Sequence, residues 1–516
     1  MSTTIDYVTF LTRNGVRLWV DKGQLCYHAK KGVLSSEELT RLRSMKGEII
    51  AELTREGAST TDDSAPIQVV CATEGPLSFQ QRWCLGLLEA HPSWKATMSY
   101  TFHLQGALDP TILEGSLRGV LRMHASLRTR VVCDCDEWRQ KIETSEGFQL
   151  PITQVSGESD SERQDNALLL IQKSAAQELD PAVDPLITTH LIRVSAREHF
   201  LVLLVHRLVT DCLGMSQALR DLWALYAGTA QKGAATSLEG PARYRDYALW
   251  QHASDRAWRQ KHGAYWNDYL AGAQPVLWPP QEWGAPATGN APGGLVSLES
   301  SFGPVLSAKL RELSQQTRTL PALVMLTLYV AGVSLWCGQR DLLMPFVVAG
   351  RAAEHEAIVG CFSYIVYLRI RLEGKETFIA LLKRVSNEFY RAAAFRQDSG
   401  RMVTQRPELL RGTLCQWLSW HPADITGSPD SQGGQLGFEV ETIRCQNPEQ
   451  LTNVPPDRAD LEMNFFDAAG EIFALAIYRP DRFAESAPAR LMRGLRSVAE
   501  HAVRDPGTPI AGWPQG

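Results

Sequence analysis

The chain has 516 residues, of which 44% are hydrophobic, 21% charged and 8% aromatic, with 52 basic against 57 acidic residues. A length of this order corresponds to about three domains of ordinary size. The net charge of −5 provides no overall positive field, so neither nucleic acid nor a membrane surface is expected as a partner. The 39 glycines and 27 prolines are ordinary for this length and exclude collagen-like and extended disordered chains.

The cysteines and the N-terminus predict a cytoplasmic protein with reduced thiols. Ten cysteines are too sparse for a disulfide scaffold, and the N-terminal segment lacks the basic and then apolar stretches of a secretory signal. Cys133 and Cys135 form the closest pair, but no second pair stands at zinc-site spacing. The surrounding run VVCDCDEW therefore predicts a hairpin turn, and no metal or directly bound cofactor is expected.

Residues 1–55 predict a small domain of their own. A short helix at residues 7–13 precedes a β-hairpin at 16–28, and a second helix begins at Ser35, which stands at capping-box spacing from Glu38. The apolar positions of this helix recur at helical intervals, at Leu39, Leu42, Met45, Ile49 and Ile50. The segment carries nine basic and six acidic residues, so it is +3 while the remaining chain is −8.

A basic hairpin with an open edge either accepts an added strand from a partner or serves as a stabilising appendage. The string LTRNGVRLWVDKGQLCYHAKKGVLSSEELTRLRSMKGEIIAEL resembles the TubC-type β-hairpin docking domain of modular peptide and polyketide assembly lines. This resemblance implies that the domain binds a short, often acidic C-terminal tail of an upstream synthase subunit. The candidate docking residues are Arg17, Lys22, Lys30 and Lys31. Residues 56–76 are small and polar and predict a linker.

The body of the chain mixes strand and helix patterns without a strict alternation, which predicts an α+β fold. The clearest strands are expected at residues 99–104, 128–133, 201–206, 342–348 and 364–372, and the clearest helices at 110–123, 214–227 and 377–395. The apolar run at 320–337 approaches the length of a membrane span. Its polar residues and the strand pattern that follows favour a buried helix that leads into a buried strand.

Five short motifs follow one another through the body: LSFQQR at 77–82, RMHASLRT at 122–129, YRDYALW at 244–250, VGCF at 359–362 and RQD at 396–398. Their sequences and order resemble the condensation domains of nonribosomal peptide synthetases. The resemblance implies two chloramphenicol-acetyltransferase-like lobes in a V-shaped pseudo-dimer, here at 77–245 and 246–516. It also implies a tunnel where the phosphopantetheine arms of a donor and an acceptor carrier protein meet.

The catalytic motif of that family, HHxxxDG, corresponds here to His206, Arg207, Asp211 and Cys212. The family's second histidine, which manages a proton during condensation, is replaced by Arg207. Arginine stays protonated up to about pH 12, so it cannot act as a general base. Arg207 either stabilises an oxyanion or carboxylate, or fills a tunnel that is no longer used. His206 is a candidate replacement base, and Asp211 is expected to form an internal ion pair that shapes the loop.

Three further positions are expected to line the tunnel: Cys212, Gly360 and Tyr364. A thiol at Cys212 either exchanges acyl groups or is simply a side chain where the family has glycine. Tyr364 stands where the family motif has asparagine, so two tunnel motifs are altered together.

The residues leave two hypotheses within the same assembly-line setting. In the first, the chain is an acyltransferase that joins a carrier-bound acyl group to an amine or alcohol. In the second, it is a catalytically silent condensation-like domain that recruits carrier proteins or a tailoring enzyme.

Overall fold

The structure of the chain is a computed structural model that divides into two compact units, Met1–Gln68 and Val69–Gly516. It describes residues 17–21, 24–28, 42–47, 49–50, 73–134, 137–232, 243–279, 294–351, 355–395, 406–418, 436–443, 452, 455, 459–468, 470–484 and 486–513.

The first unit contains the predicted hairpin. Strands β1 (Arg17–Asp21) and β2 (Gln24–His28) pair antiparallel over their full length. Residues 42–44, 46–47 and 49–50 are helical, and Leu42 and Ile49 are buried there, as the helical spacing predicted. The helix predicted at residues 7–13, the cap at Ser35, and Lys22, Lys30 and Lys31 lie outside the described residues.

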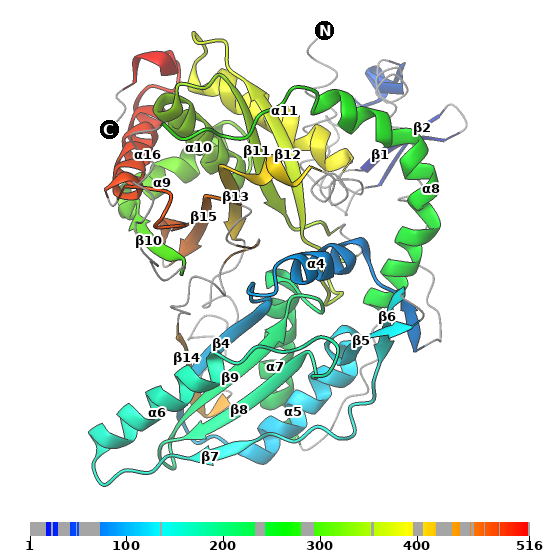
Figure 1. Cartoon of the computed structure of the whole chain (residues 1–516), viewed down its shortest axis with the longest axis vertical. Coiled ribbons are helices and arrows are strands. Elements are labelled where there is room, and N and C mark those ends of the chain that lie inside the picture. The colour runs from blue at the N-terminus through cyan, green and yellow to red at the C-terminus, as the bar shows by residue number, and fades with distance from the viewer. Residues whose placement is uncertain are drawn as a thin grey trace. The chain divides into compact units, whose positions relative to one another are not determined.

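The first lobe of the second unit is a five-stranded sheet packed against helices (Figure 1). Its strand order is β14–β4–β9–β8–β7, in which only β7 and β8 run parallel. In chain order its elements are β4 (Thr97–Gly106), α5 (Pro110–Met123), β7 (Ile152–Gln154), α6 (Asp160–Ala175), β8 (Ile187–Arg193), β9 (Glu198–His206), α7 (Cys212–Lys232) and β14 (Phe438–Ile443).

Strand β9 is buried on both faces, which explains its continuous apolar sequence. Leu201 and Leu203 pack in a cluster that contains side chains of α5 and α7, whereas Val202 and Leu204 pack in a cluster that contains side chains of α6. Successive side chains of a strand point to opposite faces of its sheet, so both faces of β9 carry apolar residues. The strand is therefore firmly held up to His206, where the altered family motif begins.

A separate three-stranded sheet contains the hairpin predicted around VVCDCDEW. Its order is β3–β6–β5, and its strands are β3 (Glu74–Pro76), β5 (Thr129–Asp134) and β6 (Glu137–Ile142). Strands β5 and β6 pair antiparallel, which confirms the predicted hairpin, while its turn residues 135–136 lie outside the described residues.

The second lobe is a six-stranded sheet with helices packed against it. Its strand order is β10–β16–β15–β13–β11–β12. The elements are β10 (Val296–Ser301), α9 (Gly303–Gln316), α10 (Pro321–Cys337), β11 (Asp341–Val348), β12 (Tyr364–Arg371), α11 (Phe378–Ala394), β13 (Thr413–Leu418), β15 (Leu461–Ala468), β16 (Glu471–Tyr478) and α16 (Ala487–Arg504). The strands and helices predicted in this part of the sequence are confirmed.

Helix α10 is the apolar run that approached membrane-span length. Residues 323–333 are all buried, and the helix leads into β11 as predicted. Within the described residues no single helix is long and apolar enough to cross a membrane, and α9 and α10 reach that length only as a pair bent by 109°.

Two segments connect the lobes. Helix α8 (Tyr244–Tyr269) has 26 residues and is therefore about 39 Å long. Its first turn bonds to Ser78, and Trp266 near its end belongs to the second-lobe core. Strand β14 follows β13 in sequence but pairs with β4 of the first lobe. No sequence pattern had indicated that crossover.

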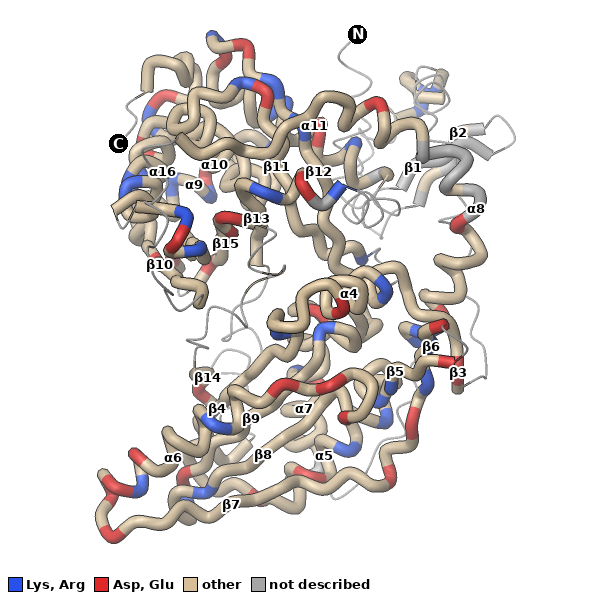
Figure 2. Tube along the Cα trace, viewed as in Figure 1, with Lys and Arg blue, Asp and Glu red and all other residues tan. Residues whose placement is uncertain are grey.

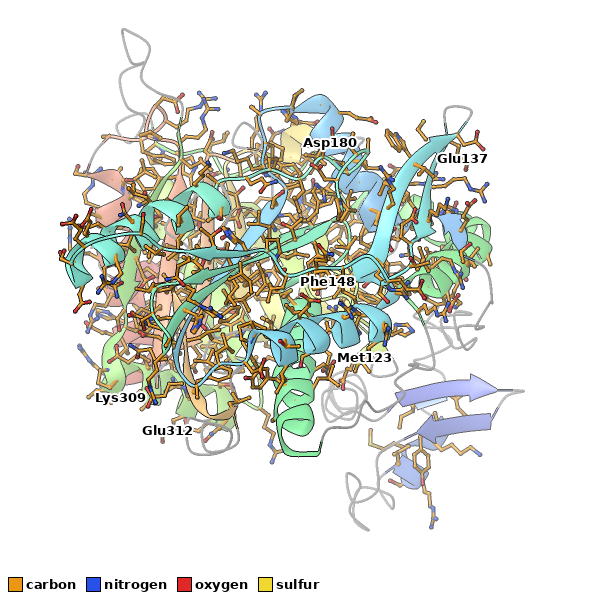
Figure 3. All side chains as sticks on the ribbon, turned by 90° about the horizontal axis from the view of Figure 1, so that it is seen from below. Met123, Glu137, Phe148, Asp180, Lys309 and Glu312 are labelled. Atoms are coloured by element: carbon orange, nitrogen blue, oxygen red, sulfur yellow. The ribbon has the colours of Figure 1, made fainter. Side chains whose placement is uncertain are left out.

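Both signs of charge are interspersed along α5 and α6 (Figure 2). Phe148 lies beside α5 (Figure 3), where its carbonyl oxygen accepts a hydrogen bond from Arg118 at 3.2 Å. Lys309 and Glu312 are exposed on α9. The groups that need explanation lie instead between α4 (Phe79–Ala90), the β9–α7 loop and the second lobe.

Candidate functional site between the lobes

The altered family motif forms the loop between β9 and α7. Two hydrogen bonds fix its backbone: the Arg207 N–H donates to the Ala96 carbonyl at 2.9 Å, and Gln81 Nε2 donates to the Leu208 carbonyl at 2.9 Å. Both use main-chain atoms of the loop. Its backbone path therefore does not depend on whether residue 207 is histidine or arginine.

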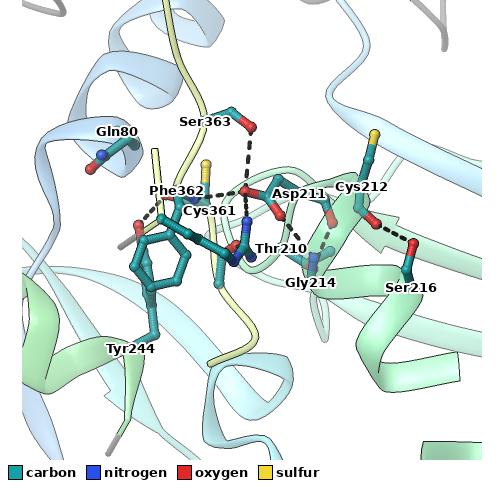
Figure 4. Close-up of polar contacts among 12 residues, drawn as sticks. Gln80, Thr210, Asp211, Cys212, Gly214, Ser216, Tyr244, Cys361, Phe362 and Ser363 are labelled. Atoms are coloured by element: carbon teal, nitrogen blue, oxygen red, sulfur yellow. Dashed lines mark hydrogen bonds and ion pairs between the residues drawn. The ribbon is translucent and has the colours of Figure 1, made fainter. Parts of the chain in front are cut away.

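Asp211 organises this loop through contacts with the second lobe (Figure 4). Its Oδ2 accepts from Arg351 Nη1 at 2.7 Å, from the Phe362 N–H at 3.0 Å and from Ser363 Oγ at 3.3 Å. Its Oδ1 accepts from the Gly214 N–H at 2.9 Å in the first turn of α7. Asp211 is thus an acceptor-only carboxylate with a donor at each oxygen, and Arg351 is its ion-pair partner.

Arg351 adds two contacts of its own. Its Nη2 donates to the Gly360 carbonyl at 3.1 Å, and its guanidinium carbon lies 4.5 Å from the centre of the Phe362 ring. The side chains of Arg351 and Asp211 are only 5% and 8% exposed, so the charge of each is compensated by the other in a buried setting.

Gly360 is required by packing against Tyr244. A Cβ at residue 360 would lie 2.0 Å from the Tyr244 ring, a distance that no side chain could tolerate. The Tyr244 hydroxyl also lies 2.7 Å from Ser78 Oγ and donates to the Cys361 carbonyl. Gly360, expected to line the tunnel, is not one of the residues that line the cavity described next.

A cavity of about 280 Å³ lies between the lobes. Most of its lining side chains are aromatic or aliphatic, and the polar and charged ones include Gln80, Arg207, Asp211, Ser363 and Gln416. From the first lobe it is lined by Gln80, Trp83, Cys84, Trp94, Met98, Arg207, Thr210, Asp211, Cys212 and Leu213, and from the second by Leu320, Ala322, Phe346, Val347, Val348, Ala349, Cys361, Ser363, Tyr364, Ile365, Phe389, Gln416, Trp417 and Leu418.

His206 lies away from this cavity. Its ring is fully buried, and Nδ1 accepts the Leu208 N–H at 3.2 Å. Burial, with a further contribution from the neighbouring Arg207 charge, lowers the pKa of His206 to about 3. A general base must reach the proton that it removes. A buried imidazole of this kind, absent from the cavity lining, does not meet that condition.

Three thiols line the cavity near Arg207: Cys84, Cys212 and Cys361. Burial raises the pKa of Cys84 to about 12, although the Arg207 charge opposes this. Burial likewise raises the pKa of Cys212 and of Cys361. Since only the thiolate is nucleophilic, Cys212 is a protonated thiol near neutral pH and does not fit a role in acyl exchange.

Tyr364 belongs to a hydrogen-bonded cluster that joins α4, α8 and β12. Its hydroxyl lies 2.5 Å from the Tyr247 hydroxyl and 3.3 Å from Gln251 Nε2. Gln251 Nε2 also lies 3.0 Å from the Tyr247 hydroxyl and 3.1 Å from Gln80 Oε1. The aromatic replacement at this family position therefore has polar partners.

Several residues of this site had no signal of their own in the sequence. Tyr244, Tyr247 and Gln80 belong to motifs that had been recognised, but nothing marked Arg351 or Gln416. The RQD motif at 396–398 lies outside the described residues. Among the residues that the structure describes, no group of three or more His, Cys, Asp or Glu side chains is arranged to hold a metal ion.

Comparison with known proteins matches both parts of the chain. The Condensation domain family matches residues 72–405, and the TubC N-terminal docking domain family matches residues 5–54. A linear gramicidin synthase protein of Brevibacillus parabrevis is 29% identical over 448 residues, which are 85% of this chain and 8% of that protein. The chain thus spans a small part of the length of this curated relative.

Two solved structures show the same fold. The EpoB cyclization–docking bidomain from Sorangium cellulosum matches 98% of this chain and 100% of its own, with a TM-score of 0.69 at 18% identity. The X-domain from teicoplanin biosynthesis matches 87% of this chain and 99% of its own, with a TM-score of 0.67 at 22% identity. The predicted α+β fold of two chloramphenicol-acetyltransferase-like lobes is confirmed. The chain belongs to the condensation-domain family of nonribosomal peptide synthetases, with a TubC-type docking domain before it.

Proposed function

We propose that the chain binds carrier-tethered acyl thioesters of an assembly line in its cavity without catalysing their condensation. The observation that supports this proposal is the position of Arg207, which lines the cavity where the family has its proton-accepting histidine. His206 is buried elsewhere, and burial keeps the Cys212 thiol protonated. The described lining therefore offers no histidine base and no thiolate nucleophile.

The cavity itself argues for a retained binding role. Its volume of about 280 Å³ remains beside Arg207, so this side chain does not fill the space between the lobes. Asp211 still holds the loop between β9 and α7 through its hydrogen bonds with Arg351 and with the Gly214 N–H. A domain that had lost every role would have no reason to keep both features.

The proposed partners are other components of a synthase. Residues 1–55 would dock the tail of an upstream subunit, and the lobes at 77–245 and 246–516 would receive carrier proteins. The linker predicted at 56–76 would end before residue 74, because Glu74–Pro76 form strand β3. A fold relative, the X-domain from teicoplanin biosynthesis, has been solved in complex with OxyB. By analogy with that protein–protein complex, we propose that the body of this chain also binds a second protein, in this case a tailoring enzyme.

A second candidate function is condensation with Arg207 as an electrostatic catalyst. The guanidinium is a permanent positive charge at the cavity, and such donors stabilise the oxyanion of an acyl-transfer intermediate. In this alternative, positioning of the two substrates and Arg207 would compensate for the missing base.

Mass spectrometry of donor- and acceptor-loaded carrier proteins separates the two functions. We expect no condensation product with the wild-type chain or with Arg207→Ala, and product with Arg207→His if the histidine alone restores the chemistry. Product formed by the wild type and lost in Arg207→Ala would reject the silent role. Arg220→His is the matched control, because Arg220 is exposed on α7 and contacts Gln217.

The docking role has a separate test. Reversing the charge at Lys22, Lys30 and Lys31 should weaken binding of an acidic C-terminal peptide from the upstream subunit, most strongly at low salt. Unchanged affinity at low ionic strength would reject electrostatic docking through these residues.

A further inference from the structure

The second-lobe wall of the cavity carries one buried amide, that of Gln416 on β13. Gln416 is 5% exposed and lines the cavity together with Trp417, Leu418, Phe346 and Phe389. An amide buried among apolar side chains is unfavourable unless its donors and acceptor are satisfied. Its hydrogen-bond partners therefore decide what the cavity can accommodate.

The orientation of this amide follows from a chain of hydrogen bonds that begins at the backbone. The Leu475 carbonyl can only accept, and it receives Asn464 Nδ2 at 3.4 Å. Asn464 consequently turns its Oδ1 toward Gln416, where it accepts a hydrogen from Nε2. The carboxyl oxygen Oε1 of Glu462 accepts the other hydrogen of Gln416 Nε2 at 3.4 Å.

Both hydrogens of Gln416 Nε2 are thereby used on the side away from solvent, within the β13–β15 pair. Glu462 and Asn464 are 3% and 1% exposed. Among the residues that the structure describes, none donates a hydrogen bond to Oε1 of Gln416. The carbonyl end of the amide is the part of Gln416 available to the cavity that this residue lines.

We propose that Gln416 is a specificity-determining residue whose Oε1 accepts an N–H from the amine of an aminoacyl group held in the cavity. This inference rests on the proposed function, in which the cavity receives carrier-tethered acyl groups. An amine satisfies an acceptor whose neighbours on the same face of the sheet include the apolar side chains of Val347 and Leu418, which also line the cavity. A hydrogen bond to Oε1 from a protonated amine is charge-assisted and is therefore stronger than one from a neutral hydroxyl.

Three hydrolysis-resistant probes test the assignment on the full chain. Each is an amide of aminopantetheine, with phenylalanine, phenyllactic acid or phenylpropionic acid, so that the probes differ only in an amine, a hydroxyl or a hydrogen. The aromatic lining motivates the phenyl group. By calorimetric titration, we expect the phenylalanyl probe to bind wild type about tenfold more tightly than the phenylpropionyl probe.

Gln416→Met should abolish this preference while leaving the affinity for the phenylpropionyl probe within about twofold, because methionine has a similar volume and no acceptor oxygen. Val347→Ala is the matched control. Val347 stands opposite Gln416 in the β11–β13 pair and also lines the cavity, so its truncation should weaken the three probes equally. Thermal unfolding of each variant verifies that it is folded.

Asn464→Leu provides a second variant if Gln416→Met does not fold. It keeps Gln416 but removes the acceptor that orients the amide, so the preference for the amine should fall without vanishing.

Four results would overturn the assignment. A phenyllactyl probe that binds as tightly as the phenylalanyl probe would show that the amine is not selected. An equal loss of affinity for all three probes in Gln416→Met would show that the group donating to Oε1 of Gln416 is an amide of the pantetheine arm, which the probes share. Probes that bind wild type and Gln416→Met alike would remove Gln416 from recognition while leaving the proposed function intact. Failure of every probe to bind the wild type would instead reject the proposed function, and the assignment with it.

Discussion

Two polar clusters contribute to the cavity lining, one through Arg207 and Asp211 and the other through Gln80 and Tyr364, and their polar groups differ in kind. The charged wall consists of Arg207, Asp211 and Arg351, and its central contact is a buried ion pair with an N–O distance of 2.7 Å. The tyrosine wall consists of Tyr247 and Tyr364 with the amides of Gln80 and Gln251, all linked through neutral hydrogen bonds. Both walls join segments that are far apart in sequence.

The contacts of Asp211 and of residue 207 show that the family motif has two parts with separate roles. Asp211 forms the structural part, because its bonds hold the loop against the second lobe. Residue 207 forms the chemical part, since its backbone is fixed by Ala96 while its side chain is directed to the cavity. Histidine can therefore be replaced at this position without disturbing the fold. A domain that has lost the catalytic base in this way can still bind its ligands.

Breaking the charged wall should have the largest effect on stability. Arg351→Met leaves the Asp211 carboxylate buried without its cation, and the loss of one partner of a buried pair costs about 3–5 kcal/mol. We expect a value near the lower end, about 3 kcal/mol, because Asp211 retains donors at Gly214 and Phe362. The free energy of unfolding from urea titration measures it.

The control for this change is an exposed ion pair on α16. Arg496 and Glu500 are 47% and 45% exposed, and Arg496→Met should lower the free energy of unfolding by less than about 1 kcal/mol. Equal losses of unfolding free energy in Arg351→Met and Arg496→Met would show that the buried Asp211–Arg351 pair stabilises the protein no more than an exposed ion pair does.

The second prediction concerns the pH dependence of stability at His206. Its pKa falls from 6.5 in the unfolded chain to about 3 in the folded protein. Between these values the unfolded state binds one more proton, so stability declines as the pH falls below about 6.5. The slope approaches about 1.4 kcal/mol per pH unit.

His206→Gln isolates this contribution, because glutamine can still accept the Leu208 N–H but does not titrate. Between pH 7 and pH 5.5, the wild type should lose about 1 kcal/mol more than the variant. Parallel stability curves for the two proteins would contradict a buried, neutral imidazole and would restore His206 as a candidate base.

The sequence predicted the fold well and the site unevenly, for physical reasons. Continuous apolar runs located β9 and α10, because burial on all sides removes polar residues from an element, and a helical repeat of apolar residues located α11. Local spacing carried no information on contacts such as Asp211–Arg351, whose partners are 140 residues apart. Local spacing also could not show whether His206 or Arg207 faces the cavity. Adjacent residues at the end of a strand point to opposite sides, and only the packing of the sheet determines which side borders the cavity. Likewise, β14 was missed because only its partner β4 explains its position.

The smallest effect is expected at the tyrosine wall. Tyr364→Phe removes a hydroxyl that contacts Tyr247 and Gln251, yet Gln251 remains as a partner for the Tyr247 hydroxyl. Because no polar group is left isolated, the loss should stay below about 1 kcal/mol. A double-mutant cycle with Tyr247→Phe, followed by urea titration, should give a coupling energy of about 0.5 kcal/mol between the two hydroxyls. A loss as large as that of Arg351→Met would show instead that neutral hydrogen bonds hold the lobes as firmly as charges do, and the distinction between the two walls would fail.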